Sequence, residues 1–331
     1  MATEDELVRA IKKLLSGEEP GVVVPIGDDA AVVEPGGHHL VVTVDTLVER
    51  VHFDPDVAQP DDLGYKAVVV NVSDVAAMGG SPRYAVVSLA VPPDTRPAWV
   101  IELYGGMRAA AEDYGLALVG GDTVRADQCV LTVTVLGTVA EGRAVTRSGA
   151  RPGDRIVVTG SLGAAAGGLR LVQGREGATR RAVMTGPGRE LVAALDRPVA
   201  RVGEGEALAQ AGATSMIDVS DGLALDLSRV CEASGVGARV RLPAVPVAEA
   251  LKELAEEIGV DPLDLALHGG EDYELVATLP AAAVEDARAR LLDRYGTPLT
   301  DIGEIIETGL LAVGEDGRER PLEAKGWDHF G

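Results

Sequence analysis

The chain has 331 residues, of which 46% are hydrophobic and 25% are charged, so it is long enough to form two globular domains. Its 52 acidic residues against 30 Lys and Arg give a formal net charge of −22, which argues against sequence-independent binding to nucleic acid or to an anionic membrane. The sequence contains no apolar segment of membrane-spanning length and no signal-peptide pattern. Cys129 and Cys231 stand far apart, outside any metal-binding motif, and we expect a cytoplasmic protein with two buried thiols.

The first half of the chain is predicted to form short strands and long helices. Thr3 and Glu6 fit a capping box ahead of an apolar stripe, which predicts an opening helix. Residues 61–78 are apolar on nearly all sides, as is typical of a buried helix. We expect strands at 22–24, 30–33, 39–44, 84–91, 116–119 and 129–139, and a further helix at 97–114.

The polar, turn-rich segment 141–154 predicts a boundary between a domain of residues 1–140 and a domain of residues 150–331. Strands and helices alternate on both sides of it, which indicates two α/β or α+β domains. In the second half we expect strands at 155–159, 214–217, near 239, at 274–278, 300–306 and 310–313. We expect helices at 162–172, 189–195, 203–211, 222–233, 247–258 and 281–295.

Short acidic strings punctuate the chain, most of them at the end of an apolar run. They are Gly27-Asp28-Asp29, Thr43-Val44-Asp45-Thr46, Asn71-Val72-Ser73-Asp74, Gly120-Gly121-Asp122-Thr123 and Asp218-Val219-Ser220-Asp221-Gly222. If these aspartates gather around one cleft, their like charges repel unless hard divalent cations are bound. Mg²⁺ held by carboxylates usually shares its remaining positions with water and substrate phosphates. The strings therefore predict a Mg²⁺-dependent enzyme acting on a phosphorylated compound.

Alternation along a strand places Thr43 and Asp45 on one face and leaves the Val44 carbonyl as a backbone ligand. Asp74 is a carboxylate in a buried helix, which is costly unless the group is paired or metal-bound. A pair with Lys66, two turns away, is the alternative for Asp74.

Simpler explanations also exist for the other aspartates. Asp28, Asp29 and Asp122 could be plain turn residues, and Asp221 could cap the helix that begins near Gly222. The sequence has no P-loop of the GxxxxGK[ST] type. The glycine loop 160–163 could present N–H groups to phosphate, or could serve only strand-to-helix packing.

Taken together, the strings resemble the thiamine-monophosphate kinase family, within the aminoimidazole-ribonucleotide-synthetase-like superfamily. The resemblance covers almost the whole chain. Besides the acidic strings it includes His52-Phe53, Thr146-Arg147-Ser148-Gly149-Ala150, Gly269-Gly270-Glu271-Asp272-Tyr273-Glu274-Leu275 and Gly326-Trp327-Asp328-His329-Phe330. It implies ATP-dependent phosphorylation of thiamine monophosphate to thiamine diphosphate by direct in-line transfer, and a homodimer formed through the N-terminal domain.

The resemblance also implies roles for individual residues. Asp29, Thr43, Val44, Asp45, Asp74, Asp122, Asp218 and Asp221 would hold several Mg²⁺ ions. Tyr104, Gly121, Asp122, Arg147 and Ser220 would contact ATP, and His52, Glu271 and Trp327 would contact thiamine monophosphate. Asp74, Asp122 and Arg147 are the residues expected to support the transfer itself. The alternatives are another ATP-using member of the superfamily, such as a selenophosphate synthetase, or a non-catalytic nucleotide sensor.

Overall fold

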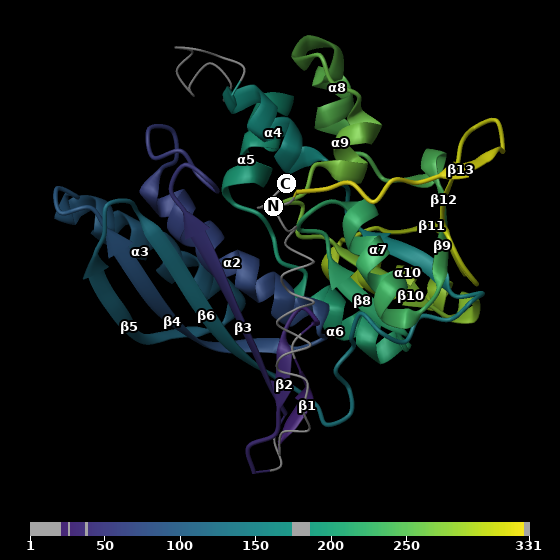
Figure 1. Ribbon diagram of the computed structural model, residues 1–331, viewed down its shortest axis with the longest axis horizontal. Helices are drawn as coiled ribbons and strands as arrows, with labels where there is room; N and C mark the ends of the chain where they lie inside the picture. The colour runs from purple at the N-terminus through teal and green to yellow at the C-terminus, as the bar shows by residue number, and fades with distance from the viewer. Residues whose placement is uncertain (1–20, 26, 37–38, 174–185, 328–331) are drawn as a thin grey trace.

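The computed structural model describes residues 21–25, 27–36, 39–173 and 186–327 and contains two sheets, each with its own helices (Figure 1). The opening helix expected near Thr3 lies outside these residues. Among the described helices, none is both long enough and apolar enough to cross a membrane.

The first domain is built on a mixed six-stranded sheet with the order β1-β2-β3-β6-β4-β5. The strands β3 and β6 pair antiparallel along their whole length, and the edge strand β5 runs parallel to β4. The strands are β1 (Val22–Val24), β2 (Ala31–Val33), β3 (His39–Val48), β4 (Ser81–Val91), β5 (Ala117–Arg125) and β6 (Val130–Val139).

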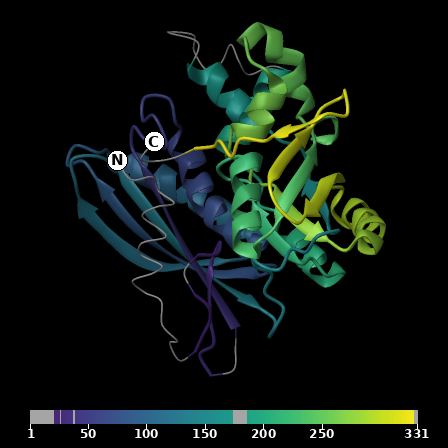
Figure 2. The same cartoon turned by 45° about the vertical axis from the view of Figure 1, so that its right-hand side comes forward.

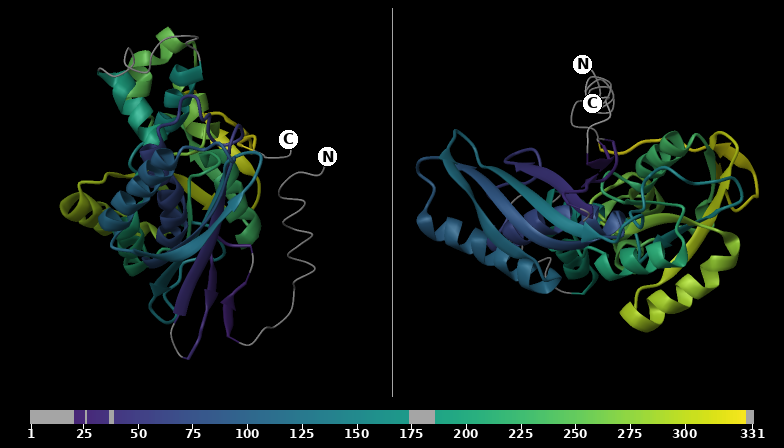
Figure 3. Two further views of the ribbon diagram at one scale, coloured as in Figure 1. Left: turned by 90° about the vertical axis from the view of Figure 1, so that its left-hand side faces the viewer. Right: turned by 90° about the horizontal axis from the view of Figure 1, so that it is seen from below.

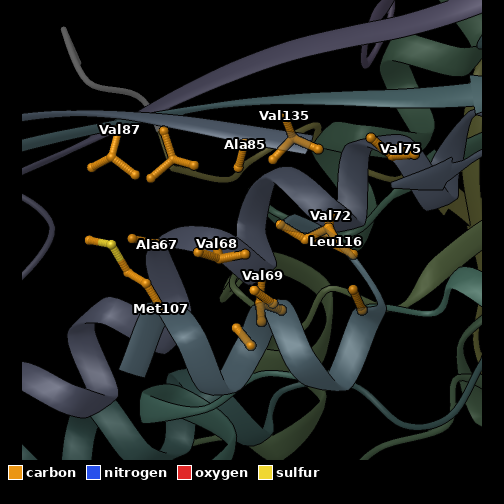
Figure 4. Packing of buried hydrophobic residues seen from close by; sticks show 14 of the residues in the cluster. Ala67, Val68, Val69, Val72, Val75, Ala85, Val87, Met107, Leu116 and Val135 are labelled. Carbon is orange, nitrogen blue, oxygen red and sulfur yellow. The ribbon is translucent and has the colours of Figure 1, made fainter. Parts of the chain in front are cut away.

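Two long helices, α2 (Pro60–Ala77) and α3 (Pro97–Tyr114), cover one face of this sheet. The core between them is built mainly from Val, Leu and Ala, as Figure 4 shows for Val68, Val72 and Val135. The helices approach closely at Gly64, because a Cβ there would lie 1.9 Å from the carbonyl oxygen of Leu103.

The other face of the first sheet is not covered by the described part of the chain (Figure 3, right). Val44 on β3 is 57% exposed and Tyr84 on β4 is 53% exposed. Val86 and Val119 are exposed as well. Apolar side chains gathered on one sheet face are typical of an interface.

The second domain is built on a seven-stranded sheet with the order β13-β12-β9-β11-β7-β10-β8. Its neighbouring strands are antiparallel except β9 and β12. The strands are β7 (Arg155–Thr159), β8 (Ser215–Asp218), β9 (Gly237–Arg241), β10 (Leu275–Leu279), β11 (Leu299–Ile306), β12 (Leu310–Val313) and β13 (Glu319–Pro321).

Helices pack on both faces of the second sheet and extend beyond it. One core cluster includes residues of α7, another includes residues of α6 and α10, and a third joins α4, α5 and α8. The helices are α4 (Ala164–Gln173), α5 (Pro187–Asp196), α6 (Val202–Ala211), α7 (Leu223–Ser234), α8 (Glu249–Ile258), α9 (Pro262–His268) and α10 (Val284–Tyr295).

The helix α2 joins the two domains, which lie side by side (Figure 2). Ala77 at its end belongs to the core cluster that α6 and α10 also form. A Cβ on Gly205 of α6 would lie 2.2 Å from the carbonyl oxygen of Ala76, so α2 and α6 are in backbone contact. The burial of α2 on nearly all sides therefore reflects contacts with both domains.

Most of the expected elements are confirmed to within a few residues. Two differ in extent: β3 continues to Val48, and β5 continues through Gly120 and Asp122 to Arg125, where we expected a turn. The short helix α9 was not expected.

Candidate active site

A cleft of about 1130 Å³ lies between the two domains. Its walls come from β3 and the loop after it and from α2. In the second domain they come from α4 and α5, from the loop before α7 and from the loop between α9 and β10. Among the described residues, eight carboxylates line it, against two cations, Arg50 and Lys66. The carboxylates are those of Asp45, Asp54, Asp62, Asp74, Asp196, Asp218, Asp221 and Glu271.

Three carboxylates from distant parts of the sequence meet in one cluster, and two of them, Asp74 and Asp218, line the cleft. Asp29 lies in the turn between β1 and β2, Asp74 on α2, and Asp218 at the end of β8. One oxygen from each carboxylate lies within 4.8 Å of the other two, a grouping that could hold a metal ion. The sequence therefore placed these three aspartates correctly as neighbours.

Neighbouring hydroxyl groups orient two of these carboxylates. The Thr43 hydroxyl donates to Asp74 Oδ2 at 2.5 Å, and the Ser73 hydroxyl donates to Asp218 Oδ2 at 2.7 Å. The buried Oδ2 of Asp29 has no hydrogen-bond partner among the described residues. A buried carboxylate oxygen without a donor beside two further carboxylates fits a divalent cation.

The electrostatics of the cluster favour proton or cation binding. Burial, followed by the charges of Asp45, Asp218 and Asp29, raises the pKa of Asp74 well above its ordinary value. Burial and the charge of Asp29 do the same for the pKa of Asp218. A cation at this position would remove both penalties, so the donor set suits Mg²⁺.

Arg147 offsets part of the negative charge. Its Nη2 lies 2.7 Å from Asp29 Oδ1, and its backbone N–H donates to both oxygens of Asp28 at 3.1 Å. Burial, together with the charge of Asp29, raises the pKa of Asp28 to about 6.

The turn that carries Ser220 and Asp221 is shaped by Asp226, a fully buried residue in the first turn of α7. Its Oδ2 accepts from three consecutive N–H groups, of Ser220, Asp221 and Gly222, at 3.1–3.2 Å. Arg229 Nη1 then bridges Asp226 and Asp221, at 2.8 and 2.6 Å. The alternative that Asp221 caps this helix is wrong, because the N-cap is Gly222 and Asp226 supplies the acceptor.

The three residues expected to contact the acceptor substrate all line the cleft. His52 Nδ1 accepts from the Val48 N–H at 3.0 Å, and the half-exposed Trp327 donates its backbone N–H to Asp221 at 3.1 Å. Glu271 has a left-handed backbone, with φ 60°, and its carboxylate lies 2.6 Å from Lys66 Nζ. The alternative that Asp74 pairs with Lys66 is therefore wrong.

The cleft of a single chain does not include Tyr104, Gly121 or Asp122. Asp122 lies on β5, three strands from β3, or about 14 Å at the usual strand spacing. Gly121 must be glycine, because a Cβ would lie 1.9 Å from the carbonyl oxygen of Val87. Tyr104 lines a separate hollow of about 400 Å³ between α3 and β5.

The glycine loop 160–163 serves packing. A Cβ on Gly160 would meet the carboxylate of Glu274 at 1.9 Å, and the Gly163 N–H donates to Asp272 at 2.9 Å. Its N–H group is thus already used within the protein, which favours the packing explanation over phosphate binding.

Sequence reasoning missed the supporting roles of Ser73, Asp226 and Arg229. Ser73 could have been found as a small polar residue next to Asp74 in an apolar helix. Asp226 could have been found as an acidic residue in the first turn of the helix after the acidic string.

Comparison with known proteins first identifies the class of protein to which the chain belongs. Residues 27–139 match the N-terminal domain of AIR synthase related proteins, and residues 151–315 match the C-terminal domain of the same class. These are the two halves that carry the two sheets.

The particular family follows from closer relatives. The chain is 38% identical to a thiamine-monophosphate kinase of Bacillus subtilis, over 93% of this chain and 94% of that one. It is 39% identical to the enzyme of the same name from Escherichia coli K12, over 93% and 92%. The solved structure of AaThiL complexed with AMPPCP and TMP superimposes with a TM-score of 0.86 at 33% identity, covering 99% of this chain and 97% of that one. The chain belongs to the thiamine-monophosphate kinase family.

Proposed function

We propose that this protein phosphorylates thiamine monophosphate to thiamine diphosphate at the expense of ATP. The observation that carries the proposal is the meeting of Asp29, Asp74 and Asp218, two of which line a cleft whose walls also present His52, Glu271 and Trp327. The acidic cluster suits metal-bound phosphates, and Trp327 and Glu271 offer an aromatic face and a hydrogen-bond acceptor for an organic ring.

We propose that the transfer is direct and in line, with several Mg²⁺ ions held by Asp29, Asp74, Asp218, the Val44 carbonyl and their neighbours. Bound Mg²⁺ would offset the charge of the phosphates of both substrates. Arg147, already at the edge of the cluster, adds fixed positive charge. The acceptor phosphate is ionised at neutral pH, so the reaction needs positioning more than a general base.

We further propose that the chain acts as a cytoplasmic homodimer whose two copies pair through the exposed face of the first sheet. That face presents Val44, Tyr84, Val86 and Val119 to solvent in one chain. The proposal also gives a reason for the position of Asp122 at the sheet edge, away from its own cleft, where a second copy could use it. Sedimentation of the purified protein tests whether it is a dimer. Mixing inactive Asp122→Asn and Asp74→Asn chains tests whether the two copies share an active site, because activity should then recover.

The decisive experiment for the function is an assay of product formation. ADP and thiamine diphosphate should appear together only when ATP, Mg²⁺ and thiamine monophosphate are all present. A thermal-shift matrix supports it: Mg²⁺ with ATP should raise Tm far more than either alone, since ATP adds about four negative charges to an acidic cleft. If ATP with EDTA stabilises the protein as much as ATP with Mg²⁺, the aspartates do not bind phosphates through metals.

A further inference from the structure

The segment Glu271-Asp272-Tyr273-Glu274, which contributes Glu271 and Tyr273 to the cleft wall, is restrained by backbone and side-chain contacts. Glu271 and Tyr273 both have left-handed backbones, with φ 60° and 51°. Their N–H groups donate to the carbonyl oxygens of Ser220 and Val219, at 2.7 and 2.9 Å. A non-glycine residue in this conformation is held there by its surroundings. The segment is thus fixed against the loop that carries Asp218 and Asp221.

The three acidic side chains of this segment have different partners. Asp272 accepts from the Gly163 N–H at 2.9 Å, and Glu274 forms a two-point ion pair with Arg201 at 2.6 and 2.8 Å. Both partners belong to the second domain. Glu271 alone of the three lines the cleft, and its partner Lys66 comes from α2 of the first domain.

Lys66 is placed on α2 by the same periodicity as Asp74. The α2 residues Leu63, Lys66, Val70 and Asp74 form one stripe along the cleft. Lys66 and Asp74 are eight residues apart, which is about 12 Å along a helix. Lys66 therefore reaches the cleft wall about two helical turns before Asp74, and it meets Glu271 there.

The charges around Lys66 show why the pair matters. Lys66 is only 7% exposed, and the other lining cation, Arg50, already pairs with Asp54 and Asp56 at 2.8 Å. Without Lys66, the carboxylate of Glu271 would face the other carboxylates of the cleft uncompensated. Repulsion would turn it away from the cleft.

We propose that Lys66 is a positioning residue that holds the Glu271 carboxylate fixed on the cleft wall. This inference rests on the proposed function. One oxygen of Glu271 is occupied by Lys66, so the carboxylate meets the acceptor in one orientation. A carboxylate repels phosphate and accepts hydrogen bonds, so Glu271 recognises the cationic, donor-bearing ring system of the acceptor rather than its phosphate.

The test compares thiamine monophosphate with thiamine, which has the same rings and no phosphate. Lys66→Met should raise the KM for thiamine monophosphate about tenfold or more and leave the KM for ATP within about twofold. Calorimetry should show that thiamine binding weakens by a similar factor. Lys66→Arg, which keeps the charge, should restore most of the affinity. Lys252→Met, which removes a surface partner of Glu249, is the matched control and should change neither KM.

A double-mutant cycle separates positioning from direct contact. Glu271→Gln should weaken thiamine binding, and Lys66→Met added to it should cost little more, because the two residues act through one interaction. Additive losses would overturn the proposal. So would a loss confined to thiamine monophosphate with thiamine binding unchanged, which would place Lys66 on the acceptor phosphate.

Two further outcomes keep the test decisive. If Lys66→Met does not fold, Lys66→Gln, which keeps a hydrogen-bond donor, must show the same separation between the two KM values. If the unaltered protein does not phosphorylate thiamine monophosphate, the proposed function fails. If it does and Lys66→Met leaves the acceptor KM unchanged, this inference alone fails.

Discussion

Ser73 and Asp218 are 145 residues apart in sequence and joined by a 2.7 Å hydrogen bond at the boundary of the two domains. Through this bond, a helix of the first domain orients the Asp218 carboxylate, which the second domain contributes to the acidic cluster. The adjacent residue on that helix, Asp74, belongs to the same cluster. The two domains thus share the cluster, and its geometry depends on how they pack.

Asp74→Asn should nearly abolish turnover and leave the protein folded. The substitution removes a charge that burial and three neighbouring carboxylates disfavour, so the metal-free protein should have a higher Tm at pH 7.5 than the unaltered chain. The increase in Tm on adding Mg²⁺ should shrink. Asp286→Asn on the exposed side of α10 is the control and should keep full activity. Near-normal turnover in Asp74→Asn at ordinary Mg²⁺ would contradict a metal-binding role.

Without Mg²⁺, stability should fall as pH rises from about 4 to 6. The folded-state pKa of Asp28 is raised from 3.8 to about 6, and those of Asp74 and Asp218 are raised as well. The folded protein therefore binds protons more tightly than the unfolded chain, and this stabilisation is lost as pH passes from the unfolded to the folded pKa. Thermal unfolding at a series of pH values in EDTA measures the slope.

Saturating Mg²⁺ should flatten or reverse that dependence, because metal and protons compete for the same carboxylates. Titration calorimetry in buffers of different ionisation enthalpy should detect protons released on Mg²⁺ binding. A slope that is the same with EDTA and with Mg²⁺ would show that the metal binds elsewhere.

Trp327→Ala should raise the KM for thiamine monophosphate more than the KM for ATP. The side chain lines the cleft and is half exposed, so its loss removes a binding surface with little effect on the core. Stacking of a cationic ring on an indole contributes roughly 0.5–2 kcal/mol, so a 2- to 30-fold change is expected. Leu292→Ala, also half exposed but on α10, should leave both values unchanged. Equal changes in both KM values for Trp327→Ala would indicate a general defect.

Arg147→Met should destabilise the metal-free protein and weaken ATP binding. It leaves Asp29, whose side chain is 1% exposed, without its ion-pair partner. Breaking a fully buried pair costs about 3–5 kcal/mol, and since the Arg147 side chain is one-fifth exposed we expect the lower end of that range. Denaturant unfolding with and without Mg²⁺ measures the loss, which the metal should partly restore. A larger loss in the presence of Mg²⁺ would contradict this account.

The fold could be predicted largely because local patterns and tertiary contacts agree. The period-two alternation of β3 predicted that Thr43 and Val44 point to opposite faces, and in the structure Thr43 is buried and Val44 exposed. Residues 61–78 are apolar on nearly all sides, which predicted a buried helix. The sequence did not predict that part of this helix contacts a second domain. The continuation of β5 through Gly120 was missed, because two consecutive glycines favour a turn in isolation and only pairing with β4 holds them extended.

The candidate site could be predicted less completely. Asp29, Asp74 and Asp218 stood out as acidic residues at the ends of apolar runs. Pairings between side chains are set by three-dimensional packing, so the sequence could not reveal that Lys66 contacts Glu271 rather than Asp74, or that Arg229 contacts Asp221. The location of Asp122 three strands from Asp45 likewise depends on strand order, which the sequence leaves open.

The backbone contact between α2 and α6 has a consequence for folding. Ala77 packs in the core of the second domain. The fully buried Ser73 donates a hydrogen bond to Asp218 of the same domain. An isolated first domain would expose this end of α2 to water, at about 25 cal/mol for each Å² of apolar surface. We therefore expect the two domains to melt in a single cooperative transition, and the acidic cluster to form only when the chain is folded as a whole.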